Sequence, residues 1–295
     1  MTGFICLDKQ QDISSFWAVR QTLKLLGEKK GGHTGTLDPF ATGVLPIAVG
    51  RATRFIELLP TDRKAYEAEI RLGITTDTLD ITGEILSKSP VNVSSSDIEK
   101  SLESFRGEIK QIPPMYSAIR KDGVRLYDLA RRGETVEREE RCVTVYRLDF
   151  LGFENDTVKI YVECSAGTYI RSIADDLGSV LGCGAVLTAL RRTRANGFSI
   201  ENSVTLEKMR ETSSDELKSL VIPLDTALGK YERITVSEGQ AIRFKNGGEL
   251  LRNRLDCPFE TGLYRVYSPA DVFLGIGEIK DNSEVLGVRR DVADE

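Results

Sequence analysis

The sequence predicts an α+β fold, with a mixed, mostly antiparallel central sheet flanked by helices and a small β-rich domain after it. Stretches of alternating apolar residues are interspersed with amphipathic stretches of helical period, without the regular strand–helix rhythm of a doubly wound parallel fold. From about residue 229 the chain changes to short strands and turns. Because 295 residues suffice for two unequal domains, we expect one over residues 1–228 and another over 229–295.

Strands of the first domain are marked by apolar runs or by apolar residues at every second position. They are expected at residues 3–10, 44–50, 64–73 and 157–164. In residues 64–73 the alternation places four side chains on one face of the strand: Tyr66, Ala68, Ile70 and Leu72.

Helices of the first domain are predicted from apolar residues three or four positions apart. They are expected at residues 15–27, 51–59, 94–107 and 167–182, and repeatedly within 202–228. The stripe expected to be buried on the first helix consists of Phe16, Val19, Leu23 and Leu26.

Polar residues at the helix ends predict where these helices begin and stop. Ser14 or Ser15 is an N-cap candidate for the first helix, which Gly27 ends. Ser96 with Glu99 is expected to form a capping box, and Thr168 to cap the helix that follows it. In the second domain all the apolar stretches are interpreted as strands: residues 232–239, 241–250, 262–268 and 272–281.

The composition limits the class of protein. No apolar run approaches the roughly 20 residues of a membrane helix, and the first 15 residues lack the basic and apolar regions of a signal peptide. The five cysteines are scattered without a CxxC pair and are interpreted as reduced, buried strand residues. With a single histidine, a zinc site is not expected. These features predict a cytoplasmic protein without a membrane partner or a metal.

Charge is distributed unevenly along the chain. The net charge of -5 argues mildly against nucleic-acid binding, because phosphate contacts need Lys and Arg. Residues 119–147 and 190–197 are nevertheless rich in arginine, so that an acidic protein with one basic face is predicted. The basic residues of these two segments include Arg120, Lys121, Arg131, Arg132, Arg191 and Arg192.

A loop at residues 31–43 (GGHTGTLDPFATG) holds the only histidine, His33, and an aspartate, Asp38, directly before a proline. Proline keeps the preceding residue extended, and the neighbouring Gly and Thr residues favour tight turns. Such a loop can present one carboxylate rigidly. The residues by themselves leave open a Pro-stabilised surface turn with a solvated aspartate, and this reading is the default for an isolated loop of this kind.

Several segments, in order, resemble those of the TruB family of pseudouridine synthases. The most specific is GGHTGTLDPFATGVLPIAVGRATR at residues 31–54. Residues 3–15 are similar to the family's first motif, although Gln10 stands where that motif usually has proline. Other similar segments are residues 64–84, 113–133, 164–178 and 190–198. The resemblance implies a pseudouridine synthase fold with a PUA-like C-terminal domain, and isomerisation of uridine 55 in the T-loop of tRNA without any cofactor.

The resemblance also implies roles for individual residues. The catalytic carboxylate falls on Asp38, its ionic partner on Arg171, and the tyrosine that stacks on the uracil on Tyr66. Ile170 and Leu190 would form apolar walls, and His33 would occupy the space vacated by the flipped base. Lys9 lies in the first motif and is expected to be structural rather than chemical.

The resemblance implies tRNA as the partner, through its T-arm and its acceptor end, with the basic residues of segments 119–147 and 190–197 as candidates for contacts with the RNA backbone. No sequence feature indicates an oligomer interface, so a monomer that needs no protein partner is expected. Two alternatives remain at this stage. One is a catalytic subunit guided by a small RNA, which the short terminal domain disfavours. The other is a non-catalytic RNA-binding or RNA-folding protein, against which the presence of Asp38, Tyr66 and Arg171 together argues.

Overall fold

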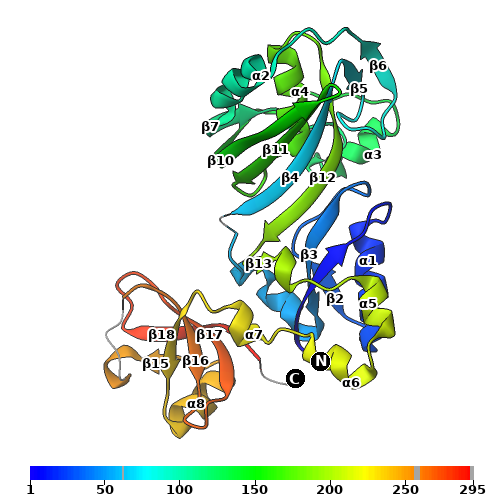
Figure 1. Cartoon of the computed structure of the whole chain (residues 1–295). Coiled ribbons are helices and arrows are strands. Elements are labelled where there is room, and N and C mark those ends of the chain that lie inside the picture. Colours follow the sequence, from blue (N-terminus) through cyan, green and yellow to red (C-terminus); the bar gives the residue numbers. More distant parts are fainter. Residues whose placement is uncertain (62, 256–259, 293–295) are drawn as a thin grey trace.

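The computed structural model describes residues 1–61, 63–255 and 260–292, which form a large sheet, a smaller sheet and two short two-stranded ribbons (Figure 1). Helices pack against both main sheets. The predicted α+β class is confirmed. Within the described residues no helix is long and apolar enough to cross a membrane.

The larger sheet contains most strands of the first domain. Its strands are β1 (Gly3–Lys9), β2 (Gly31–His33), β3 (Thr42–Val49), β4 (Lys64–Leu72), β7 (Gly107–Gln111), β10 (Arg141–Glu154), β11 (Thr157–Cys164), β12 (Ala185–Ala195) and β13 (Phe198–Ser199). The order is β1-β3-β12-β4-β11-β10-β7, with β2 paired to β3 and β13 to β12. All these pairs are antiparallel except β12 and β3, as the mixed, mostly antiparallel prediction requires.

The junction between β3 and β12 divides the large sheet into two halves. The two strands pair only at Arg191↔Thr42 and Arg192↔Gly43. In Figure 1 the long strand β12 continues from the upper half past this junction into the lower half. The loop between β2 and β3, residues 34–41, begins and ends at this junction, which places Asp38 between the halves.

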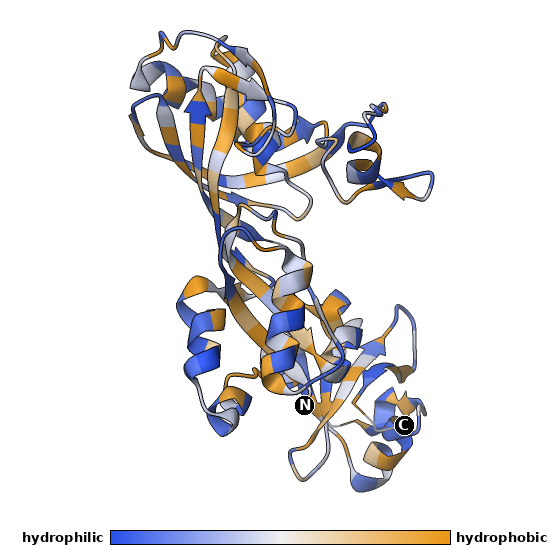
Figure 2. Ribbon diagram, turned by 90° about the vertical axis from the view of Figure 1, so that its right-hand side faces the viewer, coloured by the Kyte–Doolittle hydropathy of each residue, from blue (hydrophilic) through white to orange (hydrophobic). Residues whose placement is uncertain are grey.

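The two halves are buried differently. In β1, Ile5 and Leu7 pack in one core cluster, and Phe4 and Cys6 in another on the opposite face. In β4 the core cluster takes the residues of one face, as the alternation predicted: Tyr66, Ala68, Ile70 and Leu72. Figure 2 shows hydrophobic and hydrophilic residues alternating along such strands.

Helices cover the large sheet where the sequence period predicted them. They are α1 (Ser15–Leu26), α2 (Ser95–Leu102), α4 (Ile170–Val180), α5 (Leu206–Glu211), α6 (Ser214–Ser219) and α7 (Leu224–Ala227). The 3₁₀ helices of this domain are η1 (Gly50–Leu58), η2 (Glu103–Phe105) and η3 (Ile200–Asn202). The helix expected at 51–59 is therefore of the tighter 3₁₀ type.

Three details of the predicted helices are wrong. Phe16 is 68% exposed, because it lies in the first turn of α1, beyond the edge of the sheet contact. The capping box of α2 consists of Ser94 and Asp97, two residues before the predicted pair, since Ser94 is the first serine of the run and caps first. Thr168 does not cap α4; its hydroxyl donates to the Ser165 carbonyl instead.

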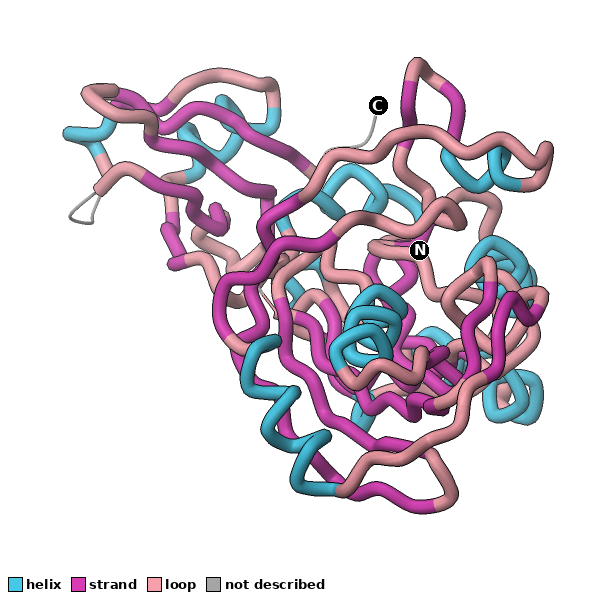
Figure 3. Tube along the Cα trace, turned by 90° about the horizontal axis from the view of Figure 1, so that it is seen from above, coloured by secondary structure: helices cyan, strands magenta, loops and turns pink. Residues whose placement is uncertain are grey.

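The smaller sheet has the order β14-β16-β17-β18-β15 and lies to one side of the larger one (Figure 3). Its elements are β14 (Glu232–Thr235), β15 (Leu250–Leu251), β16 (Gly262–Tyr267), β17 (Phe273–Ile279), β18 (Val285–Asp291), α8 (Glu238–Lys245) and η4 (Arg252–Arg254). The stretch 241–250 was predicted as a strand, but its first half, residues 241–245, belongs to α8. Ser237 and Gln240 form a capping box, and Ala241 and Phe244 are buried at helical spacing. Ile276 packs against Leu224 and Phe55 of the first domain.

Two inserted segments complete the first domain. β5 (Ile74–Thr76) and β6 (Ile85–Lys88) form one ribbon, and β8 (Arg120–Lys121) and β9 (Val124–Arg125) form another, followed by α3 (Leu126–Ala130). The predicted burial of the cysteines holds for Cys6, Cys164 and Cys183 but not for Cys142, which is exposed at the start of β10. Cys257 lies outside the described residues.

Candidate active site

The loop of residues 34–41 is held in place by side chains that form hydrogen bonds with its backbone. Ser15 Oγ accepts from the Leu37 N–H and donates to the Leu37 carbonyl, both at 2.9 Å. Lys9 Nζ, which is fully buried, donates to three carbonyl oxygens, those of Gln10, Ile13 and Pro39. Because the backbone on both sides of Asp38 is fixed, the carboxylate is positioned by the fold rather than by a mobile loop.

Asp38 is paired with Arg171, as the sequence predicted. Arg171 Nη2 lies 3.0 Å from Asp38 Oδ2, and the arginine is buried in the first turn of α4. The same guanidinium donates to the carbonyl oxygens of Thr78, at 3.1 Å, and Tyr116, at 2.9 Å. Arg171 therefore connects the loop of residues 34–41 to the β5–β6 ribbon and to the segment after β7.

A second carboxylate, Asp80, completes this group and was not among the predicted site residues. Its Oδ2 lies 3.5 Å from Arg171 Nη1, and its side chain is 5% exposed. Asp80 Oδ1 accepts hydrogen bonds from Thr78 and Thr82. The sequence did contain a signal that could have identified Asp80: in residues 75–82 (TTDTLDIT) it lies between Thr78 and Thr82. Hydroxyls on both sides of a carboxylate commonly hold it in place.

The surroundings of Asp38 shift the pKa of its carboxyl in opposite directions. Burial raises the pKa of its carboxyl above the usual 3.8, the Arg171 cation lowers it again, and the Asp80 carboxylate raises it. About a third of the side chain remains exposed. The group is thus a partly desolvated carboxylate, oriented by one arginine and reachable from outside.

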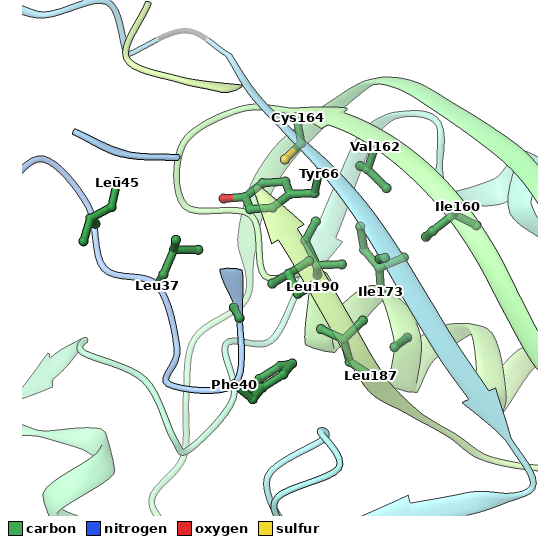
Figure 4. Packing of buried hydrophobic residues seen from close by; sticks show 14 of the residues in the cluster. Leu37, Phe40, Leu45, Tyr66, Ile160, Val162, Cys164, Ile173, Leu187 and Leu190 are labelled. Carbon is green, nitrogen blue, oxygen red and sulfur yellow. The ribbon is translucent and has the colours of Figure 1, made fainter. Parts of the chain in front are cut away.

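Tyr66 and the apolar candidates surround one side of this carboxylate. Tyr66 lies on the buried face of β4, and Leu190 and Ile170 belong to the same core cluster. In Figure 4 the Tyr66 ring lies above Leu190 and next to the loop that carries Leu37. Burial raises the pKa of the Tyr66 hydroxyl, so that it is neutral at pH 7.

His33 lies at the end of β2, directly before the loop. Burial and the nearby Arg192 cation both lower the pKa of its imidazole below 6.5. Its Nδ1 has no hydrogen-bond partner within the described part of the chain. The neutral ring therefore keeps an unused polar atom beside the site.

The predicted RNA-contact residues divide into exposed and buried ones. Arg120, Lys121, Arg131 and Arg132 are exposed in the β8–β9–α3 segment, and Arg191 is partly exposed and pairs with Asp8 at 2.8 Å. Arg192 is 1% exposed and donates to the carbonyl oxygens of Val44, Thr36 and Gly35, so its guanidinium is buried against the protein backbone, and its contact with the RNA backbone stays a prediction. Lys9 is likewise buried and binds only protein carbonyls, which leaves it a structural role.

Most of the chain matches models of one protein family. Residues 23–170 match the model of the TruB family pseudouridylate synthase N-terminal domain, and residues 171–229 and 233–290 match two TruB C-terminal domain models. The chain is 44% identical, over 97% of its length and 94% of theirs, to the tRNA pseudouridine synthase B of Pseudomonas fluorescens Pf0-1, and 43% identical over the same shares to that of Pseudomonas aeruginosa UCBPP-PA14.

A solved structure shows the same fold. The chain superposes on a chain of a Cbf5-Nop10-Gar1 complex with a TM-score of 0.73 and 26% identity, over 98% of this chain and 84% of that one. With the fold, the family models and the near full-length relatives in agreement, this chain belongs to the TruB family of pseudouridylate synthases.

Proposed function

We propose that the protein converts uridine 55 in the T-loop of tRNA to pseudouridine, with Asp38 as the catalytic carboxylate. The observation that carries the proposal is the Asp38–Arg171 ion pair, on a loop whose apolar residues pack in the same core cluster as Tyr66, Ile170 and Leu190. The near full-length similarity to proteins named tRNA pseudouridine synthase B supports tRNA as the substrate.

The reaction breaks the N1–C1′ bond of uridine, turns the uracil and joins C5 to C1′. The proton lost from C5 is balanced by one gained at N1, so the product is an isomer and the reaction needs no metal or redox cofactor. A carboxylate at C1′ serves this chemistry by covalent attack or by stabilising the positive charge that develops there. Arg171 keeps Asp38 ionised and oriented, and Tyr66 stacks on the uracil.

The target base has to leave the T-loop stack to reach this pocket, which costs a few kcal/mol. The neutral His33 ring lies beside the loop and is suited to occupy the vacated space. The exposed basic residues of the β8–β9–α3 segment supply backbone contacts to the T-arm. The smaller C-terminal sheet contacts the acceptor end of the same tRNA.

One assay tests the substrate and separates the alternatives. The purified protein is incubated with an unmodified tRNA transcript, and pseudouridine is mapped along the RNA. We expect product at the T-loop uridine with no added guide RNA or protein. Product only in the presence of a guide RNA would favour a guide-dependent subunit, and tight binding without product would favour a non-catalytic tRNA-binding protein.

A further inference from the structure

Two cations flank the glycine at the start of the Asp38 loop. A Cβ built on Gly35 would lie 3.4 Å from Lys64 Nζ and 3.9 Å from Arg192 Nη1. Lys64 is the first residue of β4 and is half-buried, whereas Arg192 belongs to β12 and is fully buried. Glycine leaves a small open niche here, which a larger side chain would fill.

Neither cation is neutralised by the protein. Within the residues that the structure describes, Lys64 Nζ has no ion pair and no hydrogen bond, and Arg192 pairs with no carboxylate. Burial and the Arg192 cation both lower the pKa of Lys64, as expected for a cation without a counterion. Such a charge destabilises the free protein, and an arriving anion would relieve it.

Backbone groups at the niche are also unused. No acceptor within the described residues bonds the N–H of Gly35 or of Thr36, although the N–H groups of Thr34 and Leu37 on either side are bonded. Adjacent N–H groups beside a cation form a recurrent type of anion site.

The niche has a defined position relative to the proposed base pocket. Lys64 and Tyr66 are two residues apart on β4 and therefore point to the same face of the strand, about 7 Å apart along it. Arg192 is the cross-strand partner of Tyr66 in the β12–β4 ladder. An RNA strand whose uracil stacks on Tyr66 would bring its sugar–phosphate backbone past this niche.

From this geometry we propose that the niche bounded by Gly35, Lys64 and Arg192 binds one phosphodiester of the substrate strand next to the flipped nucleotide, with Lys64 Nζ as the ion-pairing group. The inference rests on the proposed function, because it assumes an RNA whose target base enters the pocket at Tyr66. Lys64 makes the direct contact with the phosphate. Arg192 contributes by its positive charge and by fixing the Gly35 and Thr36 backbone.

The test uses a T-arm stem-loop RNA in which single phosphodiesters around the target uridine are replaced, one at a time, by uncharged methylphosphonates. Wild-type protein, Lys64→Met and Lys64→Arg are compared, since Met keeps the length of the side chain without the charge. Lys159→Met is the matched control. Lys159 is exposed on β11, on the sheet face opposite to that of Lys64 and Tyr66, and it pairs with Glu69. Dissociation constants, turnover rates at saturating RNA, salt dependence and thermal melting are measured for each.

We expect Lys64→Met to bind RNA about 10- to 100-fold more weakly, the loss typical of one charge-assisted hydrogen bond. Its binding should depend less on salt, with the log–log slope reduced by about 0.7 to 0.9. One methylphosphonate should weaken wild-type binding by a similar factor and have little further effect on Lys64→Met. Lys64→Arg should recover most of the affinity, and Lys159→Met should behave like wild type.

The melting temperature distinguishes binding from a structural role. Removing a half-buried, unpaired cation should leave the stability of Lys64→Met equal to wild type or higher. A variant that melts lower and loses affinity for every RNA equally would overturn the proposal, and so would a methylphosphonate penalty that persists unchanged in Lys64→Met. Failure of the wild-type protein to form pseudouridine would instead reject the proposed function, independently of these binding data.

Discussion

Two buried arginines, Arg171 and Arg192, contact the Asp38 loop, and their charges are compensated in different ways. Arg171 faces two carboxylates, Asp38 and Asp80, as well as two carbonyl oxygens. Arg192 faces three carbonyl oxygens and, within the described residues, no carboxylate. The first arginine organises acidic side chains for chemistry, while the second fixes backbone and leaves a positive potential next to the loop.

The difference explains how an acidic protein can present both a carboxylate and an attractive surface to RNA within one site. Around Arg171 two carboxylates face one guanidinium, so the charge there is not positive. Around Arg192 and Lys64 the charge is left positive, which suits a polyanion. The following predictions test this contrast, beginning with the largest expected effect.

Removing the carboxylate itself should have the largest consequence. Asp38→Ala is expected to lower the rate of pseudouridine formation by more than about 10³-fold, because the reacting centre loses its only stabilising anion at C1′. tRNA affinity should stay close to that of wild type, since Asp38 contributes no attraction for phosphate. Single-turnover assays and filter binding measure the two quantities, with Asp215→Ala, at an exposed aspartate of α6, as control. Full activity in Asp38→Ala would refute the assigned chemistry.

Replacing Arg171 should alter the protonation of Asp38. In Arg171→Met the main factor that lowers the Asp38 pKa is gone. Burial and Asp80 still raise the pKa and only Lys9 still lowers it, so the pKa should rise. The ionised carboxylate exists above its pKa, so activity should disappear at a higher pH as the solution is acidified. The rate at neutral pH should fall by about 10²-fold. A pH–rate profile that keeps its wild-type acid limb would show that Arg171 does not control Asp38.

Replacing Arg192 should affect stability more than protonation. Arg192→Met leaves the Val44, Thr36 and Gly35 carbonyls without their donor, and an unsatisfied buried group costs about 1 to 3 kcal/mol. We expect a loss of at least about 3 kcal/mol of unfolding free energy in urea denaturation. A variant as stable as wild type would mean that the loop does not depend on this anchor.

The smallest effect is expected at Asp80. Asp80→Asn retains the oxygen that accepts from Thr78 and Thr82 but removes the charge near Arg171. Since Asp80 raises the pKa of Asp38, the pKa should fall, and the acid limb should move to lower pH, opposite to the Arg171→Met shift. We expect a loss of roughly tenfold in rate from weaker orientation of the guanidinium. An acid limb displaced upward would contradict this arrangement.

Local pattern was a good guide to elements and a poorer guide to their ends. The alternation in residues 64–73 predicted which side chains of β4 are buried, because a strand places every second residue on the same face. The N-cap of α2 was misplaced by two residues, since three consecutive serines offer the same chemistry. α8 was mistaken for a strand because a short apolar run fits both periods.

The sequence by itself determined the fold class, the family resemblance and the identity of Asp38, Arg171 and Tyr66 as candidates. Only the tertiary structure decided that Asp80 joins Arg171, that Arg192 is internal, and that Lys64 has no counterion. The reason is physical. Periodicity and turn chemistry are encoded by neighbours within a few residues, whereas burial and ion pairing depend on strands and loops that are distant in the chain and meet only after folding.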